Sequence, residues 1–93
     1  MIKIVAKNTV KKENKADFIN TAKELIEKSM AEEGCISYTL NESLDGKYLT
    51  FIEEWKDEES IEMHNNSEHF KSIVPKLSQF KEGDMDVILY KEI

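Results

Sequence analysis

A chain of 93 residues that is 40% hydrophobic and 34% charged has the size and composition of one globular domain, which we take to span residues 1–93. Its net charge is −6 and its 13 basic residues are all lysines spread along the chain. A nucleic-acid partner is therefore not expected, because phosphate binding needs a concentrated basic surface. The sequence has no apolar run of membrane-helix or signal-peptide character and only one cysteine, so we expect a cytoplasmic protein without a membrane partner.

The first half of the chain has the pattern of a strand, a helix and a second strand. Residues 1–9 alternate between apolar and polar side chains, which predicts a half-buried strand. Asn14 is a typical helix N-cap, and the apolar residues that follow it at helical spacing end at Met30. We expect Gly34 to terminate this helix in a left-handed conformation, before residues 35–43 alternate again as a strand.

The second half begins with a hairpin, because Asp45-Gly46 is a strong turn signal between two alternating segments. Two helices follow the hairpin, and the apolar spacing of the second continues through Pro75, where we expect a bend. The predicted elements are, in order, a strand over residues 48–55, helices capped by Asp57 and Ser67, a loop over residues 81–84 and a strand over residues 85–90.

This order of elements predicts an α+β domain of the ferredoxin-like βαββαβ type, with a four-stranded antiparallel sheet and its helices on one face. The other face of the sheet would carry some apolar side chains. In their strands Val5, Ile88 and Tyr90 point to the face opposite the one that holds the remaining apolar residues. Apolar surface on an open sheet is usually covered by a partner, so we expect a homodimer.

Cofactor-binding motifs are absent from the sequence. Its three glycines are isolated, so neither a dinucleotide fingerprint nor a phosphate-binding loop can form, and there is no CxxC or HExxH motif. His64 and His69 would lie about 140° apart on a continuous helix, although a break at Ser67 leaves open a metal shared by both. We expect neither a metal nor an organic cofactor.

Two polar residues are candidates for a functional site. His64 follows Ile61 by one turn, on the side of the helix that should face the sheet. It is therefore either a buried histidine with satisfied ring nitrogens or a general base on a cavity wall. Asn8 ends the first strand on its apolar face, where its amide either satisfies loop backbone or lines a pocket. His69, by contrast, has the position of a first-turn surface residue.

Large aromatic side chains accompany these candidates. Trp55, Phe51 and Tyr38 are either core residues or the walls of a pocket for a flat aromatic ligand. Glu53 and Glu54 must lie on opposite faces of the sheet, so one of them points inward and needs compensation. The residues together predict a small apolar and aromatic pocket with a histidine and an amide, and they do not by themselves select a reaction.

Four segments give the sequence a resemblance to a known family. They are EEGCISY at residues 32–38, FIEEW at residues 51–55, IEMH at residues 61–64 and SEHF at residues 67–70. Their order and spacing resemble the antibiotic biosynthesis monooxygenase family. Its pattern combines Glu-(Pro/Glu)-Gly-Cys at the start of strand two, an acidic-x-Trp end of strand three and His-x4-His-Phe in the helical region. The resemblance implies a ferredoxin-like homodimer whose two sheets form a dimeric α+β barrel, and often an oxygenase that uses neither flavin nor metal.

In such an oxygenase the substrate, a quinol or polyphenol, itself supplies electrons to O2 once it is deprotonated. The match implies that the catalytic residues are His64, as base or orienter, and Asn8, as its polar partner. It also implies that the small aromatic substrate is held by aromatic side chains, namely Trp55, Tyr38, Phe51 and Phe70.

Relatives within this family point to other functions. Haem-degrading members also resemble the chain at Asn8, but they have a tryptophan at the position of His64. Their haem-ligand histidine falls near Val74, which cannot bind iron, so haem degradation is disfavoured. The isomerase that processes a phosphorylated quorum-sensing autoinducer resembles the helical segment more closely. We therefore carry three hypotheses: a cofactor-independent monooxygenase, an isomerase acting on a small phosphorylated or keto substrate, and a non-catalytic dimeric binding or stress protein.

Overall fold

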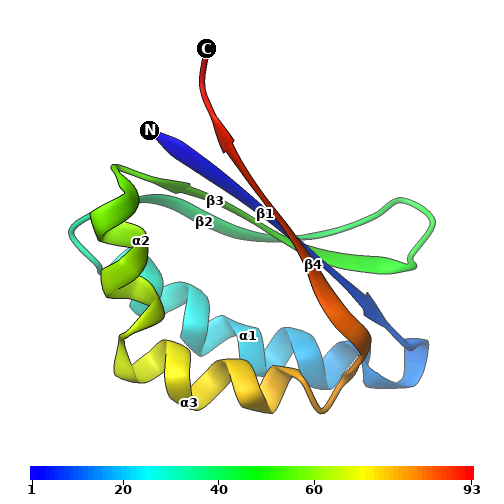
Figure 1. Ribbon diagram of the computed structural model, residues 1–93. Helices are drawn as coiled ribbons and strands as arrows, with labels where there is room; N and C mark the ends of the chain where they lie inside the picture. Colours follow the sequence, from blue (N-terminus) through cyan, green and yellow to red (C-terminus); the bar gives the residue numbers. More distant parts are fainter.

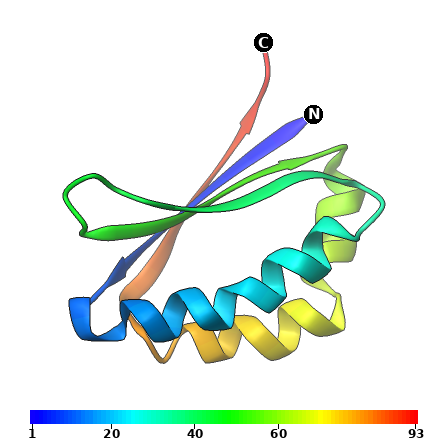
Figure 2. The same cartoon turned by 180° about the vertical axis from the view of Figure 1, so that it is seen from behind.

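A four-stranded antiparallel sheet covered by helices on one face makes up the structure, a computed structural model that describes residues 1–93 (Figures 1 and 2). The strand order is β2-β3-β1-β4, which places the first strand in the middle of the sheet. This arrangement confirms the predicted α+β, ferredoxin-like βαββαβ class. The elements are β1 (Ile2–Val10), the 3-10 turn η1 (Lys12–Asn14), α1 (Lys15–Met30), β2 (Cys35–Glu42), β3 (Tyr48–Trp55), α2 (Glu58–Asn65), α3 (Glu68–Leu77) and β4 (Lys81–Lys91).

The two short helices begin where their caps predict. The Asp57 carboxylate accepts a hydrogen bond from the backbone N–H of Ser60 at 2.8 Å, and the Ser67 hydroxyl accepts one from the N–H of Phe70 at 3.2 Å. Each bond satisfies one of the free amides at a helix start. Pro75 is accommodated inside α3, which continues to its end at Leu77. The cap at Ser67 separates α2 from α3, and this break determines how the site is built.

The start of α1 is predicted correctly and its end is not. Asn14 occupies the N-cap position before Lys15, but its side chain makes no capping hydrogen bond, because it belongs to the 3-10 turn that leads directly into the helix. Gly34 is not left-handed, and α1 ends earlier, with Ala31 at its C-terminal cap. Gly34 is required for a different reason. A Cβ atom at this position would overlap the side chain of Ser60 in α2, so the glycine allows a close approach between the two segments.

The predicted loop over residues 81–84 is also wrong, since these residues form the start of β4. Thr9 pairs with Glu82 and Lys7 pairs with Asp86, so the three residues between Glu82 and Asp86 lie opposite Asn8 alone. The register shift is a bulge, and Gly83 supports it with a φ of +65°. Residues 81–84, whose polar composition predicted a loop, therefore belong to the strand.

The core lies between the inner face of the sheet and the helices. Successive side chains of β3 alternate between the two faces, so Phe51 and Trp55 point inward and are buried. Under α1 they meet Phe18, Ala22 and Leu25, which are almost completely buried. This part of the inner layer is close-packed by apolar side chains.

The opposite face of the sheet is bare. Val5 pairs in register with Ile52 on one side and Ile88 on the other, so an apolar row crosses the centre of this face. Ile52 and Ile88 are exposed, as is Tyr90 beside them. We call this surface the open face. Two ion pairs flank its apolar row, Lys3–Glu54 at 3.7 Å and Lys7–Asp86 at 3.9 Å. No helix in the structure has the length and apolar character needed to cross a membrane.

Candidate functional site

A cavity of about 470 Å³ lies between the inner face of the sheet and the helices α2 and α3. Most of the side chains that line it are apolar, and a few polar groups lie among them, as is typical of a small-molecule site. The structure brings five of the six predicted site residues to its wall: Asn8, Tyr38, Phe51, His64 and Phe70. The sixth, Trp55, is fully buried behind the wall, with its ring 4.5 Å from that of His64.

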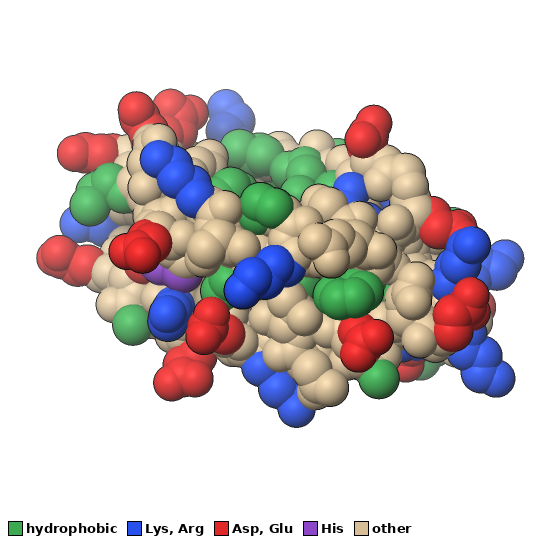
Figure 3. Space-filling model, turned by 90° about the horizontal axis from the view of Figure 1, so that it is seen from below, with side chains coloured by type: hydrophobic (Ala, Val, Ile, Leu, Met, Phe, Trp, Pro, Cys, Tyr) green, Lys and Arg blue, Asp and Glu red, His purple; other side chains and the backbone are tan.

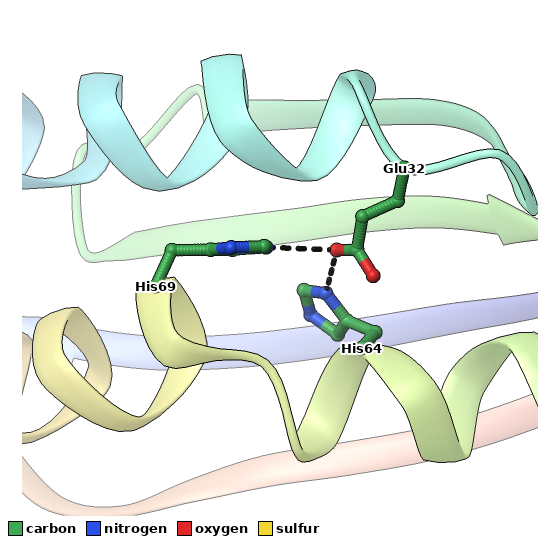
Figure 4. A group of neighbouring side chains, drawn as sticks. All are labelled: Glu32, His64 and His69. Carbon is green, nitrogen blue, oxygen red and sulfur yellow. Dashed lines mark hydrogen bonds and ion pairs between the residues drawn. The ribbon is translucent and has the colours of Figure 1, made fainter.

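His64 is held in one orientation by Glu32. Its ring is buried, with 2% of the residue exposed, and Nδ1 lies 2.6 Å from Oε2 of Glu32, in the turn between α1 and β2 (Figure 4). Because a carboxylate oxygen can only accept, Nδ1 carries the hydrogen, and Nε2 of a neutral ring is then an acceptor. Burial lowers the pKa of His64, although its bond to Glu32 opposes the shift, so the ring is neutral at physiological pH.

The second ring nitrogen of His64 opens to the cavity. Nδ1 makes the only hydrogen bond of this ring, and Ser29 Oγ is the single buried side-chain polar atom that lacks a partner. Nε2 is therefore not sealed in the core. Since His64 lines the cavity, its free nitrogen faces that space. The ring is fixed between Trp55 and Phe70, whose ring centroids lie 4.5 and 5.1 Å away.

His69 is not the free surface residue that its first-turn position predicted. Its Nε2 lies 2.9 Å from the same Oε2 of Glu32, and its side chain is 15% exposed. The break at Ser67 turns α3 relative to α2, so the two histidines converge on one carboxylate (Figure 4). A histidine reaches the surface of the helix layer (Figure 3). The carboxylate group is therefore connected to a buried ring on one side and to a partly exposed ring on the other.

The three side chains Glu32, His64 and His69 also have the donor set of a metal site. Their donor atoms lie within 4.8 Å of one another. Ligands bonded to zinc at about 2.0–2.1 Å in a tetrahedron are roughly 3.3 Å apart. The N–O separations of 2.6 and 2.9 Å are shorter than that and are those of hydrogen bonds. The group is thus a carboxylate bonded to two imidazoles, and the expectation of no metal stays a prediction.

Glu53 is the inward-pointing member of the pair Glu53 and Glu54, a choice that sequence reasoning left open and to which it gave no functional role. It lies on the inner face of β3, lines the cavity and is only 5% exposed. Its Oε1 accepts a hydrogen bond from Nε1 of Trp55 at 2.8 Å, and no lysine pairs with it. Burial raises the pKa of Glu53 to about 7, against the opposing effects of Trp55 and Tyr38. Its alternation with Phe51 and Trp55 was the signal that could have identified it.

Asn8 is anchored to strand backbone, not to a loop. Its Nδ2 donates to the carbonyl oxygens of Ala6 at 3.3 Å and Leu49 at 3.2 Å. Both partners are acceptors, so the amide nitrogen must point to them and Oδ1 is left for the cavity that Asn8 lines. The β4 bulge lies opposite this residue.

Three polar groups of the cavity lining are hydrogen-bond acceptors: Nε2 of His64, Oδ1 of Asn8 and the carboxyl of Glu53. Tyr38, Asn65 and Ser78 add groups that can donate, and burial raises the pKa of Tyr38 and keeps its hydroxyl protonated. Lys81 is the one cationic residue in the lining, and its Nζ is bonded to the carbonyl of Gly83 at 2.8 Å. Such a cavity suits a neutral, flat ligand that carries hydroxyl donors.

Comparisons with known proteins agree with this architecture. Residues 1–76 match the antibiotic biosynthesis monooxygenase family. The Bacillus subtilis protein YcnE, which carries a provisional monooxygenase name, is 37% identical over 90 residues, covering 95% of this chain and 94% of its own length. A crystal structure of a conserved Methanosarcina mazei protein has a TM-score of 0.96 at 43% identity, covering 99% of this chain and 92% of that one. Another, described as an antibiotic biosynthesis monooxygenase, has a TM-score of 0.93 at 30% identity, covering 100% and 99%. The chain therefore belongs to the antibiotic biosynthesis monooxygenase family.

Proposed function

We propose that this protein is a monooxygenase that oxidises a small hydroxylated aromatic of the quinol type with O2, without flavin, haem or metal. Membership of the family and its relationship to YcnE support a monooxygenase role. The observation that carries the proposal is the neutral His64, fixed by Glu32, beside an apolar cavity that also contains the acceptors of Asn8 and Glu53. This arrangement supplies what a phenol needs in order to react with O2.

The first step is removal of a proton. A phenolic hydroxyl with a pKa of about 10 is almost fully protonated at neutral pH, and its anion is the form that gives up electrons readily. Nε2 of His64 accepts the proton, and the Glu32 carboxylate stabilises the resulting imidazolium. A positioned imidazole contributes about 10²–10⁴-fold to such a transfer. Asn8 Oδ1 holds another hydroxyl of the ring and so fixes its orientation.

The electrons for O2 come from the substrate anion. One oxygen atom enters the ring, and the other leaves as water with the two hydrogens that the substrate gives up. An aromatic diol and O2 thus yield a hydroxyquinone and water, with no external reductant. Tyr38, Phe51 and Phe70 supply the apolar walls that hold a flat ring and exclude bulk water from the anion.

The active assembly in this proposal is a homodimer that buries the open face. Val5, Ile52, Ile88 and Tyr90 form the apolar centre of that face, and the two ion pairs lie beside it. An interface with an apolar core and a polar rim is the usual form of a stable contact. Sedimentation at roughly tens of micromolar protein should give a dimer, and a monomer under these conditions would contradict this assignment.

An aerobic screen of quinols tests the reaction. Oxygen uptake is measured with purified protein, and the product is analysed after reaction with ¹⁸O2. One labelled atom is expected in the hydroxyquinone and the other in water. The matched controls are protein-free buffer and the His64→Ala variant, which give the background oxidation. Oxygen uptake at the background rate for every quinol, or a quinone without label, would refute the proposal.

The other hypotheses receive less support from the cavity. A phosphorylated substrate needs cationic donors, and Lys81 is the only cationic side chain in the lining. A non-catalytic binding protein would bind the ring without consuming O2, so the same screen distinguishes it from an oxygenase.

A further inference from the structure

Glu53 is a buried acid for which the fold provides little compensation. Its neighbours from the packed elements are Trp55 on its own strand, Tyr38 on β2, His64 on α2 and Glu32 in the turn after α1. None of these is a permanent cation, and Glu32 is a second anion. An uncompensated carboxylate in a low-dielectric interior is unfavourable, and an apolar residue of similar volume would fit there without that cost. Stability alone therefore does not explain why a glutamate occupies this position.

The carboxyl of Glu53 keeps acceptor capacity beyond its bond to Trp55. Oε1 accepts from the N–H of Trp55 at 2.8 Å, and the side chain forms part of the cavity wall. The Tyr38 hydroxyl is a second donor to the carboxyl. Because a carboxylate has about four lone-pair sites, its other oxygen can still accept from a molecule in the cavity. His64 presents a second acceptor to the same space, and a ring with two hydroxyl groups would offer a donor to each.

We propose that Glu53 is a second proton acceptor of the site, which takes the proton of a ligand hydroxyl and makes the cavity select neutral hydroxylated rings over anions. The catalytic part of this inference rests on the proposed function, whereas the selection is a property of binding alone. With a pKa near 7, the carboxyl can both accept and return a proton at neutral pH, as a group in this role must.

The proton transfer balances within the proposed reaction. The ligand O–H bond breaks, its electron pair stays on the ligand oxygen, and the proton joins the other carboxylate oxygen of Glu53. The proton is later given to the atom of O2 that leaves as water, so the carboxylate is regenerated. An anionic ligand, such as a phosphate or carboxylate, would instead meet the negative charge of Glu53, with Lys81 as the single cation of the lining to offset it.

The Glu53→Gln variant isolates this role without changing the shape of the side chain. The Trp55 N–H still needs an acceptor, so the amide oxygen takes that bond and the NH2 group replaces the other oxygen. A ligand hydroxyl then meets a donor where it met an acceptor. Glu54→Gln, one residue along the strand and on the open face, is the matched control. Circular dichroism should show both variants folded.

Anaerobic calorimetric titrations test the selection with hydroquinone, 1,4-dimethoxybenzene and phenyl phosphate. In the parent and in Glu54→Gln, hydroquinone should bind at least about tenfold tighter than either of the others, since a hydrogen bond to a charged acceptor is involved. Glu53→Gln should lose that preference. The inference is overturned if Glu53→Gln keeps the preference, if phenyl phosphate binds as tightly as hydroquinone, or if the parent fails to bind hydroquinone.

A second measurement needs no ligand. Trp55 is the only tryptophan, and its N–H is bonded to Glu53, so its fluorescence should change as the carboxyl titrates, with a midpoint near pH 7. The change should vanish in Glu53→Gln and persist in His64→Asn, which removes the other titrating neighbour of the indole. A parent signal that is flat between pH 5 and 9, or a transition near pH 7 that survives in Glu53→Gln, would overturn the assignment.

The two proposals fail in different ways. If hydroquinone binds through Glu53 but no quinol is oxidised, the monooxygenase reaction is wrong and the binding role stands. If quinols are oxidised and Glu53→Gln turns over at the parent rate, the reaction stands and Glu53 is not a proton acceptor in it.

Discussion

Glu53 and Glu54 are identical side chains on adjacent residues, and β3 sends them into opposite surroundings. Glu54 lies on the open face, where its side chain is 28% exposed and pairs with Lys3 at 3.7 Å. Glu53 lies on the inner face, is 5% exposed and has an indole N–H as its bonded partner. The outer carboxylate is in contact with water and a lysine, whereas burial raises the pKa of the inner one to about 7.

The two faces of the sheet differ in how their charged groups are paired. The open face has its carboxylates paired with lysines across strands, in contacts that are each worth at most about 1 kcal/mol in water. The inner face has no such lysine pair, and its acids and imidazoles are bonded to each other or to fixed N–H groups. Chemistry is therefore expected only on the inner face, and the following changes test this separation.

The largest effect is expected from removing the base of the inner face. His64→Ala should lower the turnover of a confirmed quinol by at least about a hundredfold, because the substrate proton loses its acceptor. Oxygen uptake measures the rate, and circular dichroism with sedimentation shows whether the variant still folds and assembles. A folded variant with full activity would return His64 to the role of a satisfied core histidine.

The pH dependence of stability should distinguish the two glutamates. The folded-state pKa of Glu53 is raised from 4.5 to about 7, so the folded state binds more protons between these values than the unfolded state does. Stability is therefore fully present below pH 4.5 and is lost as the pH rises toward 7, by up to about 3 kcal/mol. Urea unfolding at pH 5 and pH 8 should show this loss relative to Glu53→Gln but not relative to Glu54→Gln. Equal pH profiles for all three proteins would contradict it.

A smaller effect is expected from Glu32, which acts through His64. Glu32→Gln should lower turnover by about tenfold, because the ring loses the bond that fixes its orientation and stabilises its charge. Glu32 opposes the lowering of the His64 pKa, so its removal lowers this pKa further. The acidic limb of the kcat/KM profile should therefore move to lower pH. A lower rate with an unmoved limb would indicate a structural role only. Glu33→Gln, at the neighbouring exposed residue, is the control.

The smallest effect is expected on the open face. Glu54→Gln should reduce the free energy of unfolding by less than about 1 kcal/mol, and added salt should diminish the difference, because the pair with Lys3 is partly exposed. Urea unfolding at two protein concentrations separates loss of the ion pair from loss of assembly. A loss of unfolding free energy well above about 1 kcal/mol that does not depend on protein concentration would show that the Glu54 ion pair stabilises the fold more than an exposed pair should.

Much of the fold follows from local patterns. The alternation of the strands, the caps at Asp57 and Ser67 and the Asp45-Gly46 turn each depend on a few neighbouring residues, and the structure agrees with them. The end of α1 and the start of β4 were misplaced because a tertiary contact at Gly34 and a bulge opposite Asn8 decide them. The contact at Gly34 has no local signature, whereas the bulge has only the weak one of Gly83.

The site was only partly predictable for a related reason. His64 and Asn8 could be placed on the cavity side from helical and strand periodicity, and both line it. The bond between His69 and Glu32 joins residues 37 positions apart, and it depends on the angle between α2 and α3, which no pattern of either helix records. Trp55 lies behind the wall because packing depth, unlike the choice of face, is not encoded by alternation.

The contact at Gly34 means that the spacing between Glu32 and His64 depends partly on a missing side chain. Its carbonyl accepts from the N–H of Lys56, and Ser60 occupies the volume that a Cβ would need. Glu32 is two residues before this glycine, and His64 is one helical turn after Ser60. A larger residue at position 34 would overlap the side chain of Ser60, and a shift of α2 to relieve the overlap should alter the distance between carboxylate and imidazole. Mutational tolerance at this site should therefore be limited by volume at a residue that never meets the substrate, and protein engineers could use it to adjust the base without altering any reacting group.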